Sequence, residues 1–234
     1  AWLNQQGTSA TESFWREQLN GLQSTASLGL KSSNLAYQTL QTTLPPETYN
    51  RLQTFAKHNQ ITLNTLIQAA WSLILSKYST SKDITFGVTV SGRPPELSAE
   101  EMVGLFINTL PLRAQLNAAT PLKQWLHQLR DASSQINQYS HSRLVDIQGW
   151  SDIPRGQPLF ESILVYENYP VDESLRQQES ELAIDSVESL EKTHYPVTLY
   201  ALPGESLTLK LAFQEHIGST TEREQLLHQL TQIL

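Results

Sequence analysis

The chain has 234 residues, of which 39% are hydrophobic and 8% aromatic, enough for a packed core in one large domain or two small ones. Its net charge is −7, from 16 lysines and arginines against 23 aspartates and glutamates, which argues against a nucleic-acid partner. The lack of cysteine excludes disulfides, thiolate metal sites and cysteine nucleophiles, and no signal peptide or long apolar span is found. We therefore expect a soluble, cytoplasmic protein that does not enter a membrane.

The first part of the sequence predicts a helix, a strand and a second helix. Ser9 and Glu12 have the spacing of a capping box at the start of the first helix, and Gly21 is suited to end it. Residues 37–44 form the predicted strand. Pro46 fits the first turn of the second helix, because a proline there loses no helical hydrogen bond.

The third predicted helix begins after Thr62 and is the most hydrophobic of the chain. Its apolar side chains cover more than one side of the helix, which predicts burial on more than one side, beneath a sheet. They are Leu63, Leu66, Ile67, Ala70, Trp71, Leu73, Ile74, Leu75 and Tyr78.

Residues 84–114 contain two apolar runs, 84–90 and 106–112, that predict buried strands. The segment between them is polar and rich in proline and glutamate, and loops of that length inside a domain are usually functional or disordered. Gly92 permits close approach of the backbone, and the prolines that follow bias Arg93 toward extended geometry. The plainer interpretation is a surface connection with a solvated acidic helix.

The rest of the sequence predicts two more helices and four strands. One helix opens after Pro121, and the other at a second capping box from Ser219 to Glu222. Residues 137–157 and 168–181 are predicted as loops, because they lack periodicity. The predicted strands are residues 160–166, 183–187, 196–201 and 207–213. This mixture predicts an α/β sandwich with helices packed on a sheet.

No catalytic or metal-binding motif is found in the sequence. Ser91 does not lie in a G-x-S-x-G hydrolase motif, and no phosphate-binding glycine loop is present. The histidines have no zinc-site spacing, so no metal site is predicted. They are His58, His127, His141, His194, His216 and His228.

Residues 102–113, MVGLFINTLPLR, resemble a core motif of the condensation domains of nonribosomal peptide synthetases, V/I-G-x-F-x-N-T-x-x-x-R. The matching residues are Val103, Gly104, Phe106, Asn108, Thr109 and Arg113. Residues 62–97, 158–170 and 191–213 are similar to the same family. Residues 1–3 resemble the tail of its Y-x-D-Y-x-x-W-L motif, so the resemblance covers nearly the whole chain.

The resemblance implies an α/β (α+β) two-layer sandwich: a chloramphenicol-acetyltransferase-like lobe with a mixed sheet and helices packed on one face. Condensation domains have two such lobes, and their catalytic histidine lies in an H-H-x-x-x-D-G motif upstream of the Y-x-D-Y-x-x-W-L region. Residues 1–234 are therefore expected to be the C-terminal lobe, with no catalytic residue of its own. The intact domain forms peptide bonds between thioesters tethered to carrier proteins, and the isolated lobe is expected to be inactive.

The family pattern puts Ser91, Gly92 and Arg93 in the bridge to the other lobe, at the floor of the substrate tunnel. Ser91 would then hydrogen-bond the pantetheine amide. Arg93 would hold the lobes together through a carboxylate, unless it is a solvated surface arginine. Asn108 and Thr109 would form hydrogen bonds near the tunnel, or would satisfy backbone groups at a strand end.

Asn168 resembles the position of a polar tunnel residue, or is an ordinary turn asparagine. Arg113 is expected to be a structural ion-pair partner, and His141 and His194 are expected on the surface or in packing roles. Residues 168–181 resemble the latch that reaches across to the other lobe.

The implied partners are aminoacyl and peptidyl carrier proteins, the N-terminal lobe of the same domain and an adjacent adenylation domain. No cofactor or metal is expected to bind directly, because carrier proteins present the phosphopantetheine arm. Two alternatives stay open: a non-catalytic docking module for carrier proteins or tailoring enzymes, and an epimerising or ester-forming relative on the same scaffold.

Overall fold

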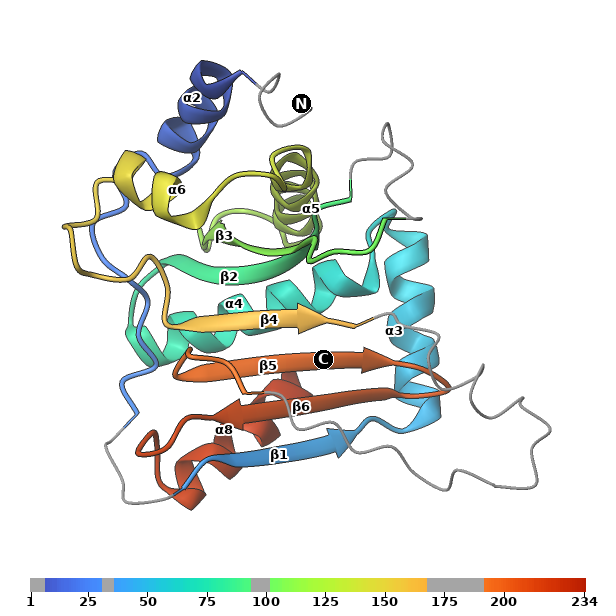
Figure 1. Ribbon diagram of the computed structural model, residues 1–234. Coiled ribbons are helices and arrows are strands. Elements are labelled where there is room, and N and C mark those ends of the chain that lie inside the picture. Colours follow the sequence, from blue (N-terminus) through green and yellow to red (C-terminus); the bar gives the residue numbers. More distant parts are fainter. Residues whose placement is uncertain (1–6, 31–35, 94–101, 168–191) are drawn as a thin grey trace.

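The computed structural model describes residues 7–30, 36–93, 102–167 and 192–234, which form a six-stranded sheet and its helices (Figure 1). The strands are β1 (Gln38–Thr43), β2 (Asp83–Ser91), β3 (Ile107–Gln115), β4 (Ser162–Tyr166), β5 (Val197–Pro203) and β6 (Leu207–Phe213). The helices are α2 (Thr8–Gln18), α3 (Pro46–His58), α4 (Leu63–Ser79), α5 (Leu122–Gln138), α6 (Leu144–Trp150) and α8 (Thr220–Ile233).

The sheet is mixed, with the strand order β1-β6-β5-β4-β2-β3. In its centre β2, β4 and β5 are parallel neighbours, and β3, β6 and β1 are joined to them by antiparallel pairing. The first and last strands of the described chain therefore lie side by side. The predicted α/β architecture with a mixed sheet is confirmed.

One face of the sheet is covered by a layer of helices, with α4 behind the central strands and α8 behind β5 and β6 (Figure 1). Trp71 of α4 donates a hydrogen bond from Nε1 to Ser162 Oγ of β4 over 3.3 Å. Ile67, Trp71 and Ile74 are fully buried. The broad apolar stripe predicted for this helix therefore does pack beneath the sheet.

Two short helices, α2 and α6, lie together near β3, outside this layer (Figure 1). Arg113 of β3 donates from Nη1 to the carbonyls of Gln18 and Asn20 at 3.1 and 2.8 Å. The C-terminal end of α2 is thereby held to β3.

The helix caps agree with the sequence at two positions and differ at a third. Thr62 accepts a hydrogen bond from the Thr65 amide, and Ser219 and Glu222 form a complete capping box, as predicted. The predicted capping box at Ser9 is wrong, because α2 already begins at Thr8, with Gly7 as a cap that has no side chain to accept a hydrogen bond.

The prediction of a loop over residues 137–157 is also wrong, because α6 occupies part of it. This helix has seven residues, no side-chain cap and one buried residue, Ile147, so it has almost no helical periodicity to detect. The predicted loop 168–181 and strand 183–187 lie outside the described residues. Within the described ranges, no helix is long and apolar enough to cross a membrane.

Candidate functional site

Five of the residues singled out in the sequence lie together at one end of the β2–β3 pair. The antiparallel register sets Ser91 opposite Ile107, Val90 opposite Asn108, and Thr89 opposite Thr109. Gly92 and Arg93 continue directly from β2. The site is therefore formed where β2 ends and β3 begins, at the right-hand end of the sheet in Figure 1.

Gly92 closes the base of the connection between the two strands. Its amide donates to the Phe106 carbonyl over 2.9 Å, one step beyond the last paired residues. A Cβ atom at position 92 would collide with that same carbonyl oxygen. Glycine is thus required here for the close approach of two backbones, as the sequence predicted.

The Arg93 side chain folds back toward the residues just before β3, at the far end of the connection between the two strands. Its Nη1 donates to the Met102 carbonyl over 3.0 Å, and its guanidinium carbon lies 4.4 Å from the centre of the Phe106 ring. Both contacts are made within the described residues, so Arg93 braces the residues that lead into β3.

Asn108 fastens the start of β3 to the turn between α5 and α6. Its Nδ2 donates to the carbonyls of Ser140 and Ser142 at 2.9 and 2.7 Å, while its Oδ1 accepts from the Thr109 amide at 2.9 Å. Both donors of the side-chain amide are thus engaged with backbone carbonyls. This geometry matches the second of the two roles expected for Asn108, the satisfaction of backbone groups.

The turn that Asn108 holds contains His141, which the sequence assigned to a surface or packing role. Burial lowers the pKa of the His141 imidazole below its usual value of 6.5, which favours the neutral ring. Trp15 of α2 donates to Ser142 Oγ over 2.9 Å and so fixes the turn from a further side. Sequence reasoning missed this turn as part of the site. Its one signal was the polar run Tyr139–Ser142 after a long amphipathic helix.

Arg113 lies at the opposite end of the β2–β3 pair. Its Nε and Nη2 bond the two carboxylate oxygens of Asp83 at 2.8 and 2.6 Å, in the bidentate geometry that favours arginine. With its bonds to α2, the guanidinium joins β2, β3 and α2, far from Ser91. The arrangement is that of a structural ion pair.

Of the remaining predicted residues, Ser91 lies at the same end of the β2–β3 pair as Asn108, and His194 lies elsewhere. Ser91 is exposed at the strand end, where its hydroxyl can both donate and accept hydrogen bonds. His194 lies before β5, 4.3 Å from the ring of Tyr195, and Asn168 lies outside the described residues. No group of three metal-binding side chains is found among the residues that the structure describes.

Beside these polar groups lies an exposed apolar run. Val103 and Leu105 are almost fully exposed, and Met102 and Ile107 are about half exposed. Four exposed apolar side chains within six consecutive residues are unusual, and contiguous apolar surfaces of proteins often bind another molecule. The site therefore combines an exposed hydroxyl, a turn closed by a glycine and exposed apolar side chains. Together they offer a surface that another molecule can contact.

Comparison with known sequences identifies the family. The profile of the family described as Condensation domain matches residues 1–234. Two subunits of the linear gramicidin synthase of Brevibacillus parabrevis are 40% and 43% identical to this chain, and both alignments cover the whole of this chain. The chain spans only 3% of the first of these proteins and 5% of the second.

Comparison with solved structures agrees on the fold. A four-domain nonribosomal peptide synthetase bound to AMP and glycine matches with a TM-score of 0.82 at 16% identity, over 97% of this chain and 19% of its own. The X-domain from teicoplanin biosynthesis matches with 0.78 at 16% identity, over 99% of this chain and 55% of its own. The condensation domain of the Monacolin K polyketide synthase matches with 0.74 at 17% identity, over 96% and 56%. The chain belongs to the condensation-domain family.

Proposed function

We propose that this chain is the C-terminal lobe of a condensation domain that joins carrier-protein-tethered aminoacyl and peptidyl thioesters in a nonribosomal peptide synthetase. The observation that carries the proposal is the family match over residues 1–234, combined with coverage of just over half of two solved domains of this fold. A chain that matches a family throughout but fills half of its domain is expected to be one of two lobes.

The geometry at the end of β2 and β3 supports a role as one wall of a shared site. Ser91 is exposed there, and the apolar residues Met102–Ile107 beside it would be covered if a second lobe packed against them. We infer that Ser91 contacts the pantetheine arm presented by a carrier protein. Arg93 and Asn108 would support this contact by holding in place the backbone at the ends of β2 and β3.

The chemistry of peptide-bond formation divides between positioning and proton transfer. Holding two tethered reactants in line is worth about 7–11 kcal/mol of the barrier, and a histidine acid–base about 10²–10⁴-fold in rate. We place the proton-transferring histidine in the N-terminal lobe, because the family pattern puts it in an H-H-x-x-x-D-G motif, which this chain lacks. The isolated chain should then lack measurable condensation activity.

The proposal is tested by reconstitution. The chain is mixed with two carrier proteins loaded with an aminoacyl donor and acceptor, with and without a separately produced N-terminal lobe from the same synthetase. We expect dipeptidyl product, detected by mass spectrometry, only when both lobes are present. Product from this chain alone would disprove the assignment of the catalytic group, and a stable two-lobe complex without product would favour a non-catalytic role.

One observation favours that second candidate, a docking module. The X-domain from teicoplanin biosynthesis has the same fold, and a solved structure shows it in complex with OxyB. A domain of this fold can therefore bind another protein. The sequence upstream of residue 1 in the parent synthetase separates the two functions, since an intact H-H-x-x-x-D-G motif supports condensation.

A further inference from the structure

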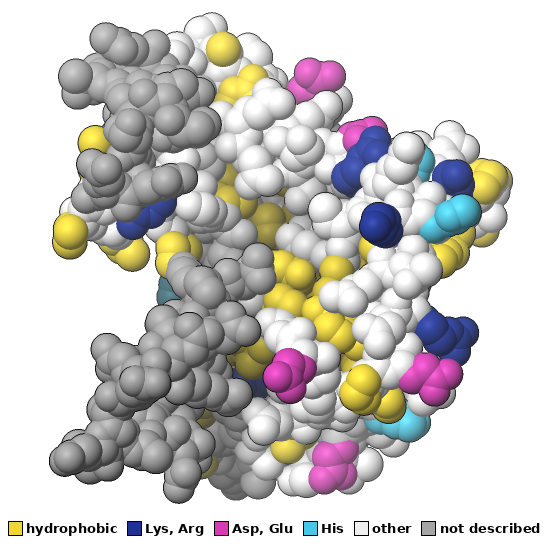
Figure 2. All heavy atoms as spheres, turned by 90° about the vertical axis from the view of Figure 1, so that its right-hand side faces the viewer, with side chains coloured by type: hydrophobic (Ala, Val, Ile, Leu, Met, Phe, Trp, Pro, Cys, Tyr) yellow, Lys and Arg dark blue, Asp and Glu magenta, His cyan; other side chains and the backbone are white. Residues whose placement is uncertain are grey.

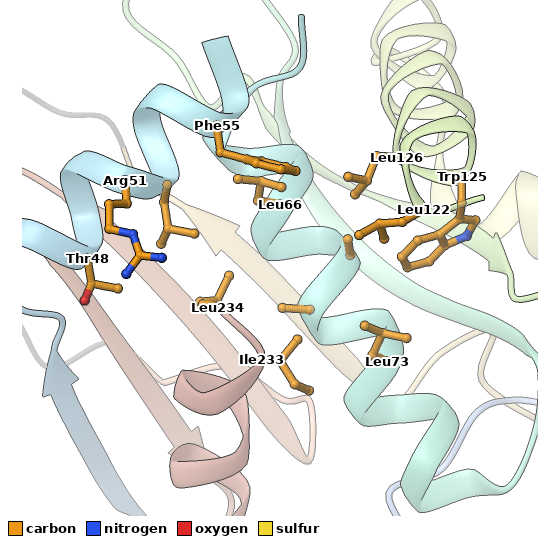
Figure 3. Close-up of a pocket in the computed structure, with 13 residues that line it drawn as sticks. Thr48, Arg51, Phe55, Leu66, Leu73, Leu122, Trp125, Leu126, Ile233 and Leu234 are labelled. Atoms are coloured by element: carbon orange, nitrogen blue, oxygen red, sulfur yellow. The ribbon is translucent and has the colours of Figure 1, made fainter. Parts of the chain in front are cut away.

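A groove crosses the outer surface of the helical layer, on the far side of α4 from the sheet. It is bounded by α3, α5 and the last turn of α8, and its volume is about 410 Å³ (Figure 3). The side chains that line it are mostly apolar and come from four helices that are distant in sequence. None of the residues of the candidate site at the end of β2 takes part in it, so the groove calls for a separate explanation.

The floor of the groove is a second apolar stripe on α4. Leu66, Ala69, Ala70 and Leu73 have the spacing i, i+3, i+4 and i+7 of one helix face. The deeper face of α4, with Trp71, packs under the sheet. Leu66, Ala69 and Ala70 are already almost fully buried, so a partner would reach this stripe with side chains that enter between the residues of the rim.

The rim of the groove consists of large apolar side chains left in water. Phe55 of α3 is 44% exposed, Leu122 of α5 is 59% exposed and Ile233 of α8 is 41% exposed. Figure 3 shows them around the stripe of α4, with the Phe55 ring over Leu66. Three such side chains from three helices around one hollow are the arrangement that receives the apolar anchors of an amphipathic helix.

The helices that bound the groove carry a slight excess of positive charge, although the whole chain has a net charge of −7. Six of their residues are basic, namely Arg51, Lys57, Lys77, Lys123, Arg130 and Arg223. Four are acidic, namely Glu47, Asp131, Glu222 and Glu224. Figure 2 shows apolar side chains in a hollow of the surface that includes α3, with both basic and acidic side chains around it.

We propose that this groove is a docking site for an amphipathic helix of a partner protein, with leucine-like anchors on one face and acidic residues on its flanks. The apolar stripe and rim would bind the anchors, and Arg51, the charged residue that lines the groove, would pair with an acidic flank. A second copy of this chain fits less well, because a symmetric contact would bring two positively charged helical faces together.

The test uses the 234-residue chain and two labelled synthetic peptides of about 18 residues, roughly five helical turns. Both have leucine at the anchor positions, and one has glutamate where the other has lysine. We expect the acidic peptide to bind with a Kd on the order of 10 μM by fluorescence anisotropy, at least about tenfold more tightly than the basic one. Its affinity should fall as salt is added.

Two matched variants localise the binding. Leu122→Glu changes the rim of the groove, while Val145→Glu adds the same charge near the start of α6, at a residue that is 60% exposed and outside the groove. Leu122→Glu should weaken binding of the acidic peptide by about tenfold or more, and Val145→Glu should leave it unchanged. Because both side chains are largely exposed, both variants should fold, as circular dichroism would verify.

Three outcomes would overturn the proposal. The first is equal binding of the acidic and the basic peptide, and the second is an equal effect of the two substitutions. The third is self-association of the chain in sedimentation experiments that Leu122→Glu abolishes, which would make a second copy the occupant of the groove. None of these results bears on the proposed condensation function, which depends on other residues.

Discussion

The two ends of the β2–β3 pair are made from the same two strands but are completed in different ways. At one end Arg113 bonds the Asp83 carboxylate and two carbonyls of the α2 segment, so this end is closed by contacts within the lobe. At the other end Asn108 and Gly92 also bond carbonyls, but Ser91 and the apolar residues beyond them face solvent. The difference indicates that one end stabilises the fold, while the other leaves a hydroxyl and apolar side chains open to solvent.

Gly92→Ala should lower the free energy of unfolding more than any other substitution at the two ends of the β2–β3 pair. The added methyl group collides with the Phe106 carbonyl, and neither backbone can move freely. We expect a loss of about 3 kcal/mol in the free energy of unfolding, measured with urea. Gly149→Ala in α6 is the control, since its Cβ would meet nothing within 4 Å, and it should be neutral or slightly stabilising. Equal losses for the two variants would show that the closed turn at Gly92 is unimportant.

Arg113→Ala, at the opposite end of the β2–β3 pair, should lower the free energy of unfolding by a somewhat smaller amount. It leaves the Asp83 carboxylate without its bidentate partner and removes the donor to Gln18 and Asn20, at a side chain that is only 12% exposed. We expect a loss of about 2 kcal/mol in the free energy of unfolding. Arg143→Ala, which removes an exposed pair with Asp146 at 3.7 Å, should cost less than about 0.5 kcal/mol. Similar values for both would contradict the structural role of Arg113.

The smallest change in the free energy of unfolding is expected from substitution of His141, which lies in the turn that Asn108 holds. Because burial lowers the pKa of this imidazole, the unfolded chain binds a proton more readily than the folded one. Its contribution to stability is present above about pH 6.5 and is lost as the pH falls below that value. His141→Gln should therefore flatten the fall in unfolding free energy between neutral and mildly acidic pH, as followed by urea titrations. An unchanged slope would show that another group controls it.

The sequence was most informative where a structure depends on neighbouring residues. The caps at Thr62 and Ser219 and the strands on either side of residues 94–101 follow from local spacing, and the resemblance supplied the architecture. The contact of Asn108 with Ser140 and Ser142 could not be found in this way, because it joins residues more than thirty positions apart. Helix α6 was missed because its stability comes from packing against α2 instead of from its own periodicity.

The connection between β2 and β3 has one further consequence. Its two stems are joined to each other by the Gly92–Phe106 backbone bond and by the Arg93 guanidinium, and these contacts hold the ends of β2 and β3 together. The entropy of closing such a loop grows only slowly with its length, by about 0.6 kcal/mol per doubling. A change in the number of residues between these two stems is therefore expected to cost the β2–β3 pair little stability.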